Sequence, residues 1–290
     1  MKKLAVLVVH GMGDQKANFA DGMIKELERR IRDDEKLDPS EIEWRPVWWA
    51  PVLSGAESDL WRRCSRGNDL DYRKLRLFVL HALGDAVAYR KVESKNVCDG
   101  DINAYERIHA RVGAAMKALR QRSREGKAAT ASEVPLIVIA HSLGCHLLSN
   151  YIWDRQKKGA KSLGNDFEDM KTLSGLLTFG CNIPLFTLAH KKVQPIKFPL
   201  PVTKYFPRGT GAKVVRAATK WWNYYDPDDI LGWPLKPLSS SYRRAVHRDV
   251  VIDVGGFLTS WNPTSHGGYW EDNDFTVPVS KAIARILKLL

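Results

Sequence analysis

Three short segments, far apart in the chain, carry a serine, several aspartates and a histidine of the kinds that nucleophilic catalysis uses. Residues 140–144 read Ala-His-Ser-Leu-Gly, residues 223–229 read Asn-Tyr-Tyr-Asp-Pro-Asp-Asp, and residues 265–270 read Ser-His-Gly-Gly-Tyr-Trp. A serine hydroxyl becomes a strong nucleophile when a histidine takes its proton and an acid orients that histidine. The segments together predict a serine nucleophile, a histidine base and an orienting aspartate.

Ser142 is the predicted nucleophile because of the residues on either side of it. Residues 134–140 read Val-Pro-Leu-Ile-Val-Ile-Ala, an uncharged and β-branched run that is typical of a strand buried in a parallel sheet. The residues after Gly144 have helical spacing. A sharp turn from strand to helix strains the middle residue and projects its side chain from the sheet edge. Small residues such as Ala140 and Gly144 are needed there because the strand and the helix nearly collide.

Residues 10–13, His-Gly-Met-Gly, directly follow the apolar run 4–9 and predict a loop that stabilises negative charge on a substrate. The amides of Met12 and Leu143 are the expected oxyanion donors, and each would contribute about 3 kcal/mol to lowering the barrier. The glycines let the backbone approach the substrate closely. A phosphate-binding loop is the alternative, although His-Gly-Met-Gly-Asp matches neither the dinucleotide fingerprint nor the P-loop.

Three carboxylates compete for the role of the acid. Asp226, Asp228 and Asp229 all follow the aromatic, strand-like run 220–225. Asp229 is favoured because it precedes the apolar pair 230–231, whereas Asp226 and the proline after it are typical of the turn that begins a loop. Asp226 and Asp228 remain alternatives, as does the interpretation that all three are solvated loop residues.

His266 is the predicted base among the eight histidines of the chain. It follows the last expected strand, residues 249–254, and the two glycines after it leave its ring unhindered. His247 precedes that strand and so lies at the wrong end, and His10 is expected to brace the 10–13 loop. The others flank the nucleophile or lie in segments without a motif: His141, His146, His81, His109 and His190.

The order serine, aspartate, histidine is that of the α/β-hydrolase fold. The chain resembles lipase-like members of that superfamily, especially the DDHD-type intracellular phospholipases. Those show Val-His-Gly near the start of the domain, Gly-His-Ser-Leu-Gly at the nucleophile, an Asn…His-Pro-x-Asp-Pro acid loop and a final His-x-x-Tyr-Trp. The corresponding segments here begin at Val9, Ala140, Asn223 and His266.

This chain departs from the family pattern at three positions. Ala140 replaces a glycine, Asp226 replaces a histidine, and Ile230 replaces the proline after the acid. Superposition of the two acid loops puts the acid of the family on Asp229, in agreement with the choice made from the residues themselves. The resemblance implies the fold and the reaction type, and it carries little information about the substrate.

The predicted fold class is α/β, with a mostly parallel sheet flanked by helices. The strand that begins at Leu4 corresponds to an interior strand of the α/β-hydrolase fold, so the N-terminal hairpin is expected to be trimmed. A length of 290 residues suits one domain over 1–290, with cap insertions expected at 51–100 and 182–218. Other expected elements are strands at 41–49 (near an edge, because of Pro46) and 171–180, and helices at 18–32, 56–64, 72–90, 104–124 and 277–290.

Positive charge is concentrated in one part of the chain, whose formal net charge is +12. Between Met170 and Tyr225 there are nine basic residues and no acidic one. Residues 186–216, in which aromatic residues and prolines are interleaved with this charge, are expected to form part of a cap that attracts an anionic lipid surface or an acidic substrate. The alternative is a solvated loop on a basic protein. No nucleic-acid partner is expected, since charge alone without a binding motif does not indicate one.

The predicted activity is the hydrolysis of carboxylic esters, either lipids or small esters, through an acyl-enzyme. A non-catalytic or acyl-transferring protein on the same fold is the alternative. The four cysteines have neither metal-site nor disulfide spacing, so no metal or other cofactor and a reduced, cytoplasmic protein are expected. Residues 4–9 are interpreted as a strand rather than a signal peptide, and no run reaches the roughly 20 apolar residues of a spanning helix.

Overall fold

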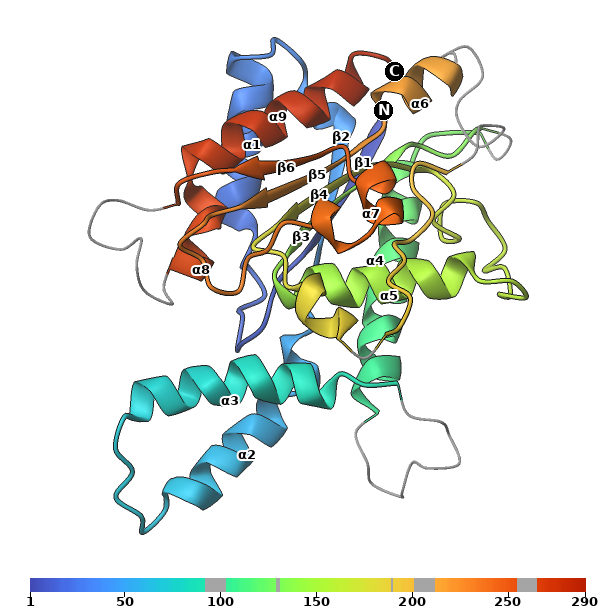
Figure 1. Cartoon of the computed structure of the whole chain (residues 1–290). Coiled ribbons are helices and arrows are strands. Elements are labelled where there is room, and N and C mark those ends of the chain that lie inside the picture. The colour runs from blue at the N-terminus through green and yellow to red at the C-terminus, as the bar shows by residue number, and fades with distance from the viewer. Residues whose placement is uncertain (92–102, 129–130, 189, 201–211, 255–264) are drawn as a thin grey trace.

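A six-stranded sheet forms the centre of the protein in a computed structural model of the whole chain (Figure 1). The structure describes residues 1–91, 103–128, 131–188, 190–200, 212–254 and 265–290. The strand order is β2-β1-β3-β4-β5-β6, and every neighbouring pair is parallel. The strands are β1 (Leu4–Val9), β2 (Ile42–Val47), β3 (Leu136–His141), β4 (Leu173–Phe179), β5 (Lys220–Tyr225) and β6 (Arg248–Val251). The predicted α/β class with a parallel sheet is confirmed.

Helices cover both faces of the sheet (Figure 1). On one face α1 (Asp21–Asp33) packs against α9 (Asn273–Leu287), and on the other lie α4 (Ala104–Ser123) and α5 (Leu143–Gln156). Alternate residues of β1 divide between the two layers, because successive side chains of a strand point to opposite faces. Val6 and Val8 belong to the core under α1 and α9, whereas Leu7 and Val9 belong to the core under α4.

The burial of the strands follows their position in the sheet. Every residue of β1, β3 and β4 is buried, as expected for interior strands with helices on both sides. β2 lies at one edge of the sheet, which confirms the position inferred from Pro46. β6 forms the other edge and ends at Val251, so the strand predicted at 249–254 is shorter than expected. Beyond its end, the amide of Ile252 still donates to the carbonyl of Tyr225, and the amide of Val254 donates to the Asp226 side chain.

The α2–α3 hairpin occupies the described part of the predicted 51–100 insertion. α2 (Ser54–Ser65) and α3 (Arg73–Ala88) pack against each other and project from the rest of the molecule (Figure 1). The described part of the predicted 182–218 insertion contains a 3-10 turn, η4 (Ile183–Thr187), and α6 (Ala212–Ala218). Residues 189 and 201–211 of that segment lie outside the described residues.

The C-terminal helix begins earlier than the sequence pattern indicates. A start at 277 is wrong by four residues, since α9 begins at Asn273. Asp272 caps the helix by accepting from the amide of Asp274, and Pro278 therefore falls in its second turn. Two further short helices are α7 (Ser240–Ala245) and α8 (Ser265–Gly268).

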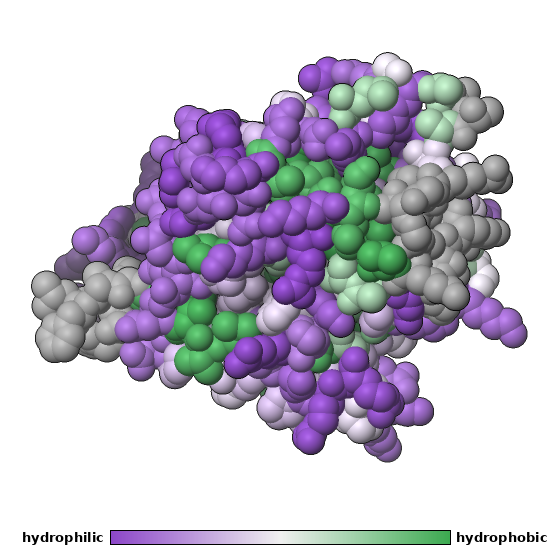
Figure 2. All heavy atoms as spheres, turned by 90° about the horizontal axis from the view of Figure 1, so that it is seen from above, coloured by the Kyte–Doolittle hydropathy of each residue, from purple (hydrophilic) through white to green (hydrophobic). Residues whose placement is uncertain are grey.

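The upper face of the molecule in the view of Figure 1, where α1 and α9 lie, is largely hydrophilic, with apolar residues in small separate patches (Figure 2). This agrees with the amphipathic character of α1, whose buried residues Met23, Leu27 and Ile31 face the sheet. Among the residues that the structure describes, no helix is both long and apolar enough to cross a bilayer.

Candidate active site

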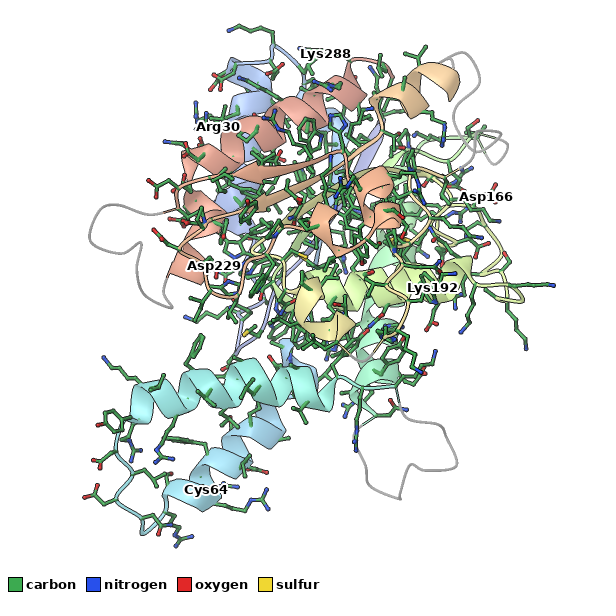
Figure 3. All side chains as sticks on the ribbon, viewed as in Figure 1. Arg30, Cys64, Asp166, Lys192, Asp229 and Lys288 are labelled. Atoms are coloured by element: carbon green, nitrogen blue, oxygen red, sulfur yellow. The ribbon has the colours of Figure 1, made fainter. Side chains whose placement is uncertain are left out.

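The predicted site residues meet at the carboxyl-terminal edge of the sheet. Parallel strands bring their carboxyl ends to one edge, so the loops after β1, β3 and β5 lie close together there. These loops carry Met12, Ser142 and Asp229, and the short helix α8 adds His266. Figure 3 labels Asp229 on this side of the sheet, beyond the ends of the strands.

Ser142 occupies the sharp turn between β3 and α5. Its backbone is left-handed, with φ +51° and ψ −125°, an unusual conformation for a residue with a side chain. Its amide donates to the carbonyl of Phe179 on β4, 3.0 Å away, which ties the turn to the sheet. A Cβ on Gly144 would lie 2.4 Å from the carbonyl oxygen of His10, so only glycine fits there. A small residue is needed after the serine as expected, but the crowding comes from the end of β1 and the loop after it rather than from a collision between β3 and α5.

The side chains of Ser142, His266 and Asp229 form a continuous hydrogen-bonded series. The Nε2 atom of His266 lies 2.6 Å from the Ser142 Oγ, and its Nδ1 lies 2.9 and 2.8 Å from the two carboxylate oxygens of Asp229. All three residues are buried. An ionised carboxylate can only accept, so Nδ1 carries the proton and Nε2 is free to accept from the serine hydroxyl. The geometry is that of a nucleophile, its base and the acid that orients the base.

Asp229 is held in the ionised form by its neighbours. Burial is the largest single influence and would raise the pKa of its carboxyl group, but the hydrogen bond and charge of His266, together with two further donors, outweigh burial. The amide of Leu231 and the hydroxyl of Tyr269 also donate to this carboxylate, at 3.0 and 2.9 Å. The pKa of Asp229 is therefore lowered from its ordinary value, and the group stays negative opposite the imidazole.

The other two acidic candidates have different partners. Asp226 is buried and accepts from the amides of Asp228 and Val254, at 2.8 and 2.7 Å, so it shapes the loop. Asp228 is exposed. Tyr269 connects the loop to the site, because its hydroxyl accepts from the amide of Asp226 and donates to Asp229. No role was predicted for Tyr269, although the final His-x-x-Tyr-Trp pattern contains it.

Close packing fixes the path of the acid loop. The side-chain amide of Asn223, on β5, donates to the carbonyl of Trp233, 3.0 Å away, where the loop ends. The amide of Gly232 donates to the carbonyl of Asp229 at 3.0 Å. A Cβ on Gly232 would lie 2.5 Å from a carboxylate oxygen of Asp229, so a larger residue would displace the acid.

The loop after β1 is pressed against the nucleophile. A Cβ on Gly11 would lie only 2.6 Å from the Cβ of Ser142. The Nε2 atom of His10 accepts from the amides of Trp49 and Ala50, so its Nδ1 carries the proton and donates to the carbonyl of Gly11, 2.7 Å away. Burial lowers the pKa of His10 to about 4, which keeps it neutral. His10 therefore braces the loop, as the sequence indicates.

The two expected oxyanion donors flank Ser142. Met12 follows Gly11 in this loop, and Leu143 is the first residue of α5, where helix amides lack an intrahelical partner. Within the described ranges, neither amide donates a hydrogen bond to a protein group. Both are therefore available to a bound substrate.

His141, the residue before the nucleophile, has a structural role that the sequence does not reveal. It is buried, and its Nε2 lies 2.8 Å from the carbonyl oxygen of His266, to which it donates. Burial, followed by the charge of His266, holds the pKa of His141 well below its ordinary value, so it remains neutral.

Three described basic residues between Met170 and Tyr225 line two cavities. One, of about 270 Å³, lies beside α5 and is lined by His146, Phe186 and Lys192 among others. Figure 3 shows Lys192 next to α5. The other, of about 450 Å³, lies where β5 begins, and Arg216 and Lys220 contribute to its lining. The stretch therefore contributes charge both beside α5 and at the end of the sheet where β5 begins.

Among the described residues, no group of three or more histidine, cysteine, aspartate and glutamate side chains could hold a metal ion. The described cysteines, Cys64, Cys145 and Cys181, are free thiols. The chain matches no protein-family model. No curated protein is significantly similar to it in sequence.

Proposed function

We propose that this protein is a serine hydrolase of the α/β-hydrolase fold that cleaves carboxylic esters. The observation that carries the proposal is the buried series from Ser142 through His266 to Asp229, with hydrogen bonds of 2.6 to 2.9 Å. A strained serine, a correctly oriented imidazole and an ionised acid are the parts that acyl transfer requires.

The fold proposal rests on the order and position of the same residues. The nucleophile follows β3, an interior strand, the acid follows β5, and the histidine follows β6. That order along a parallel sheet is the order of the α/β-hydrolase fold. The motif resemblance favours a relationship to the DDHD-type phospholipases.

In the first half of the reaction, the Oγ of Ser142 attacks the ester carbonyl carbon while the Nε2 of His266 takes its proton. Asp229 stabilises the resulting imidazolium. The carbonyl oxygen becomes an oxyanion between the amides of Met12 and Leu143, where fixed donors lower the barrier. The tetrahedral intermediate collapses, the bond to the leaving oxygen breaks, and His266 returns the proton to the departing alcohol. An acyl-serine remains.

In the second half, water replaces the alcohol. The Nε2 of His266 takes a proton from the water as its oxygen attacks the acyl carbon. The second tetrahedral intermediate uses the same two amides. Its collapse releases the carboxylic acid, and Ser142 regains its proton from His266. The chemistry uses only these side chains and water.

A fluorophosphonate probe tests the proposal directly. The probe reacts with an activated serine, so mass spectrometry of digested protein should find the adduct on Ser142. Ser142→Ala should abolish both labelling and turnover of a chromogenic ester, whereas the matched variant Ser149→Ala on the same helix should retain both. Labelling that survives in Ser142→Ala, or an unlabelled wild-type protein, would remove the basis of the proposal.

A further inference from the structure

The projecting α2–α3 hairpin contacts the loop after β1 through a buried carboxylate. Asp85, on α3, accepts a hydrogen bond of 2.8 Å from the amide of Gly13, which is 72 residues away in sequence. Only 2% of the surface of Asp85 is exposed. Figure 1 shows α3 on the side where the loop after β1 leaves the sheet, and Figure 3 labels Cys64 in α2, the outer helix of the hairpin.

Gly13, which donates this hydrogen bond, is held in one position in the loop. Gly13 has a φ of +94°, a conformation that side-chain-bearing residues rarely adopt, although a Cβ there would meet no atom within 4 Å. Glycine is therefore needed here for its backbone conformation and not because a side chain would lack space. Gly11, at the other end of the same turn, is held against Ser142. Met12 lies between these two points, so the position of its amide depends on both.

Asp85 also has an ionisable neighbour on each helix of the hairpin. Glu57 on α2 and His81, one turn earlier on α3, both interact with it. The Nδ1 of His81 lies 3.0 Å from one carboxylate oxygen of Glu57, and the other oxygen of Glu57 is buried without a hydrogen-bond partner. A buried oxygen of this kind is costly unless a proton is shared with it.

These interactions affect the protonation of Asp85. Burial raises the pKa of Asp85 above its ordinary value, the amide of Gly13 and the charge of His81 oppose this rise, and the charge of Glu57 adds to it. The proton of Asp85 can bond to the free oxygen of Glu57 while its other oxygen accepts from Gly13. The two helices and the loop are then joined by one satisfied set of hydrogen bonds.

We infer that Asp85 is a positioning residue that holds the loop after β1, and with it the Met12 amide, in the arrangement that stabilises the oxyanion. Glu57 and His81 support Asp85 from the two helices of the hairpin. The inference rests on the proposed function, because it assigns Asp85 a part in that reaction. It also gives the hairpin a part in positioning the proposed oxyanion site, through the hydrogen bond between Asp85 and Gly13.

Kinetics of three variants test this assignment. Asp85→Ala removes the acceptor, Asp85→Asn keeps an oxygen for the Gly13 amide, and Leu83→Ala is the matched control, since Leu83 is 60% exposed on the outer side of α3. Loss of a well-placed oxyanion donor costs about 100-fold in kcat, so Asp85→Ala should lose roughly 10- to 100-fold in kcat with little change in KM. Asp85→Asn should keep most of the wild-type kcat. It should also lack the ionisation that Asp85 contributes to the pH profile of kcat.

Hydrogen exchange provides a readout that does not depend on turnover. The amides of residues 11–15 should exchange faster in Asp85→Ala than in wild type, and at the wild-type rate in Asp85→Asn and Leu83→Ala. Wild-type kcat in Asp85→Ala, or an equal loss in Leu83→Ala, overturns the inference while the proposed function stands. If the wild-type protein neither hydrolyses esters nor is labelled at Ser142, both the inference about Asp85 and the proposed function are overturned. This holds even if the exchange rates show that Asp85 anchors the loop.

Discussion

The side chain of His141 holds the main chain of His266. The Nε2 of His141 donates to the carbonyl oxygen of His266 across 2.8 Å, although the two residues are 125 positions apart. The ring of His141 stacks on Phe179, with centroids 4.7 Å apart, and lies 4.8 Å from the ring of His266. His141, the last residue of β3, therefore holds the backbone of the proposed base, while the next residue in sequence is the proposed nucleophile.

The first prediction is that His141 contributes to turnover through the hydrogen bond that its Nε2 donates to the carbonyl of His266. His141→Ala leaves the buried carbonyl of His266 without a partner, which costs about 1–3 kcal/mol and lets the imidazole shift. We expect roughly a tenfold loss of kcat in His141→Ala, because even a displacement of about 1 Å costs up to 100-fold in rate. His141→Gln retains a donor and should lose less. Ester turnover, with circular dichroism to confirm folding, measures this, and equal losses in the two variants would refute the role of the donor.

The second prediction separates the three aspartates of the acid loop. Asp229→Asn removes the charge that orients His266 and should lower kcat by about 10⁴-fold, as in other triads. The thermal stability of this variant should change less than its activity. A nearly active Asp229→Asn would show that the acid is elsewhere and that the contact of 2.8 Å with His266 is structural.

Asp226→Asn and Asp228→Asn are the matched controls for that experiment. Asp226 accepts two backbone hydrogen bonds with its two oxygens, and asparagine can accept only one of them. Asp226→Asn should therefore lose about 1–3 kcal/mol of stability while keeping most of its turnover. Asp228 is exposed, so its variant should resemble wild type in both measurements. An inactive but stable Asp226→Asn would contradict this division of roles.

The parts of the site that local sequence determines were predictable. β1 occupies the predicted run 4–9 because a short, uncharged, apolar segment can be buried on both faces only within a sheet. Ser142 could be located because strand, turn and helix are consecutive in sequence. Asp229 and His266 needed one further argument, namely the order in which such residues follow the strands of a parallel sheet.

The residues that sequence did not reveal act across long separations. Asp85 bonds to Gly13 over 72 positions, and Tyr269 bonds to Asp229 over 40. A lone aspartate in an inserted helix has no pattern that distinguishes it from a solvated one. Only the position of α3 beside the loop after β1 makes it a buried acceptor. The early start of α9 was missed for a different reason, because the helix pattern expected from 277 did not take account of the cap at Asp272.

The third prediction concerns stability at low pH. Burial lowers the pKa of His10, His109 and His146 to about 4, and it also holds the pKa of His141 well below its ordinary value. The unfolded chain takes up protons near pH 6.5 that these folded sites exclude, so stability is lost as pH falls from about 6.5 towards 4. Each group shifted by about 2.5 pH units contributes up to about 3 kcal/mol of this loss. Asp85, with its raised pKa, has the opposite effect on stability as pH falls. The four histidines together outweigh this single group.

Urea unfolding at pH 7 and pH 5 measures this effect. The free energy of unfolding should fall by several kcal/mol between the two pH values, and His109→Gln should reduce the difference by about 2 kcal/mol, since burial keeps this ring neutral at both. His190 is exposed, so His190→Gln serves as the control and should leave the difference unchanged. Unfolding free energies that do not change with pH would mean that these rings are protonated in the folded protein.

The last prediction is that the basic stretch within 186–216 binds anionic lipid surfaces. Lys191, Lys192 and Lys197 are exposed, and Lys192 lines the cavity beside α5. Each lysine near an anionic bilayer contributes roughly 1 kcal/mol, so a few acting together give measurable adsorption. The attraction should fade as salt shortens the Debye length from about 10 Å at 0.1 M to about 3 Å at 1 M.

Co-sedimentation of inactive Ser142→Ala with vesicles tests this surface without consuming lipid. Binding should be strong to vesicles that contain phosphatidylserine, weak to neutral vesicles, and lost at high salt. Lys191→Glu with Lys192→Glu should reduce it at least tenfold, because reversing two charges removes about 2 kcal/mol of attraction and adds repulsion. The control, Lys117→Glu with Lys281→Glu, makes the same change in net charge on α4 and α9. Equal binding by the two pairs would mean that net charge alone drives adsorption, and equal binding to neutral vesicles would identify the lysines as a solvated surface.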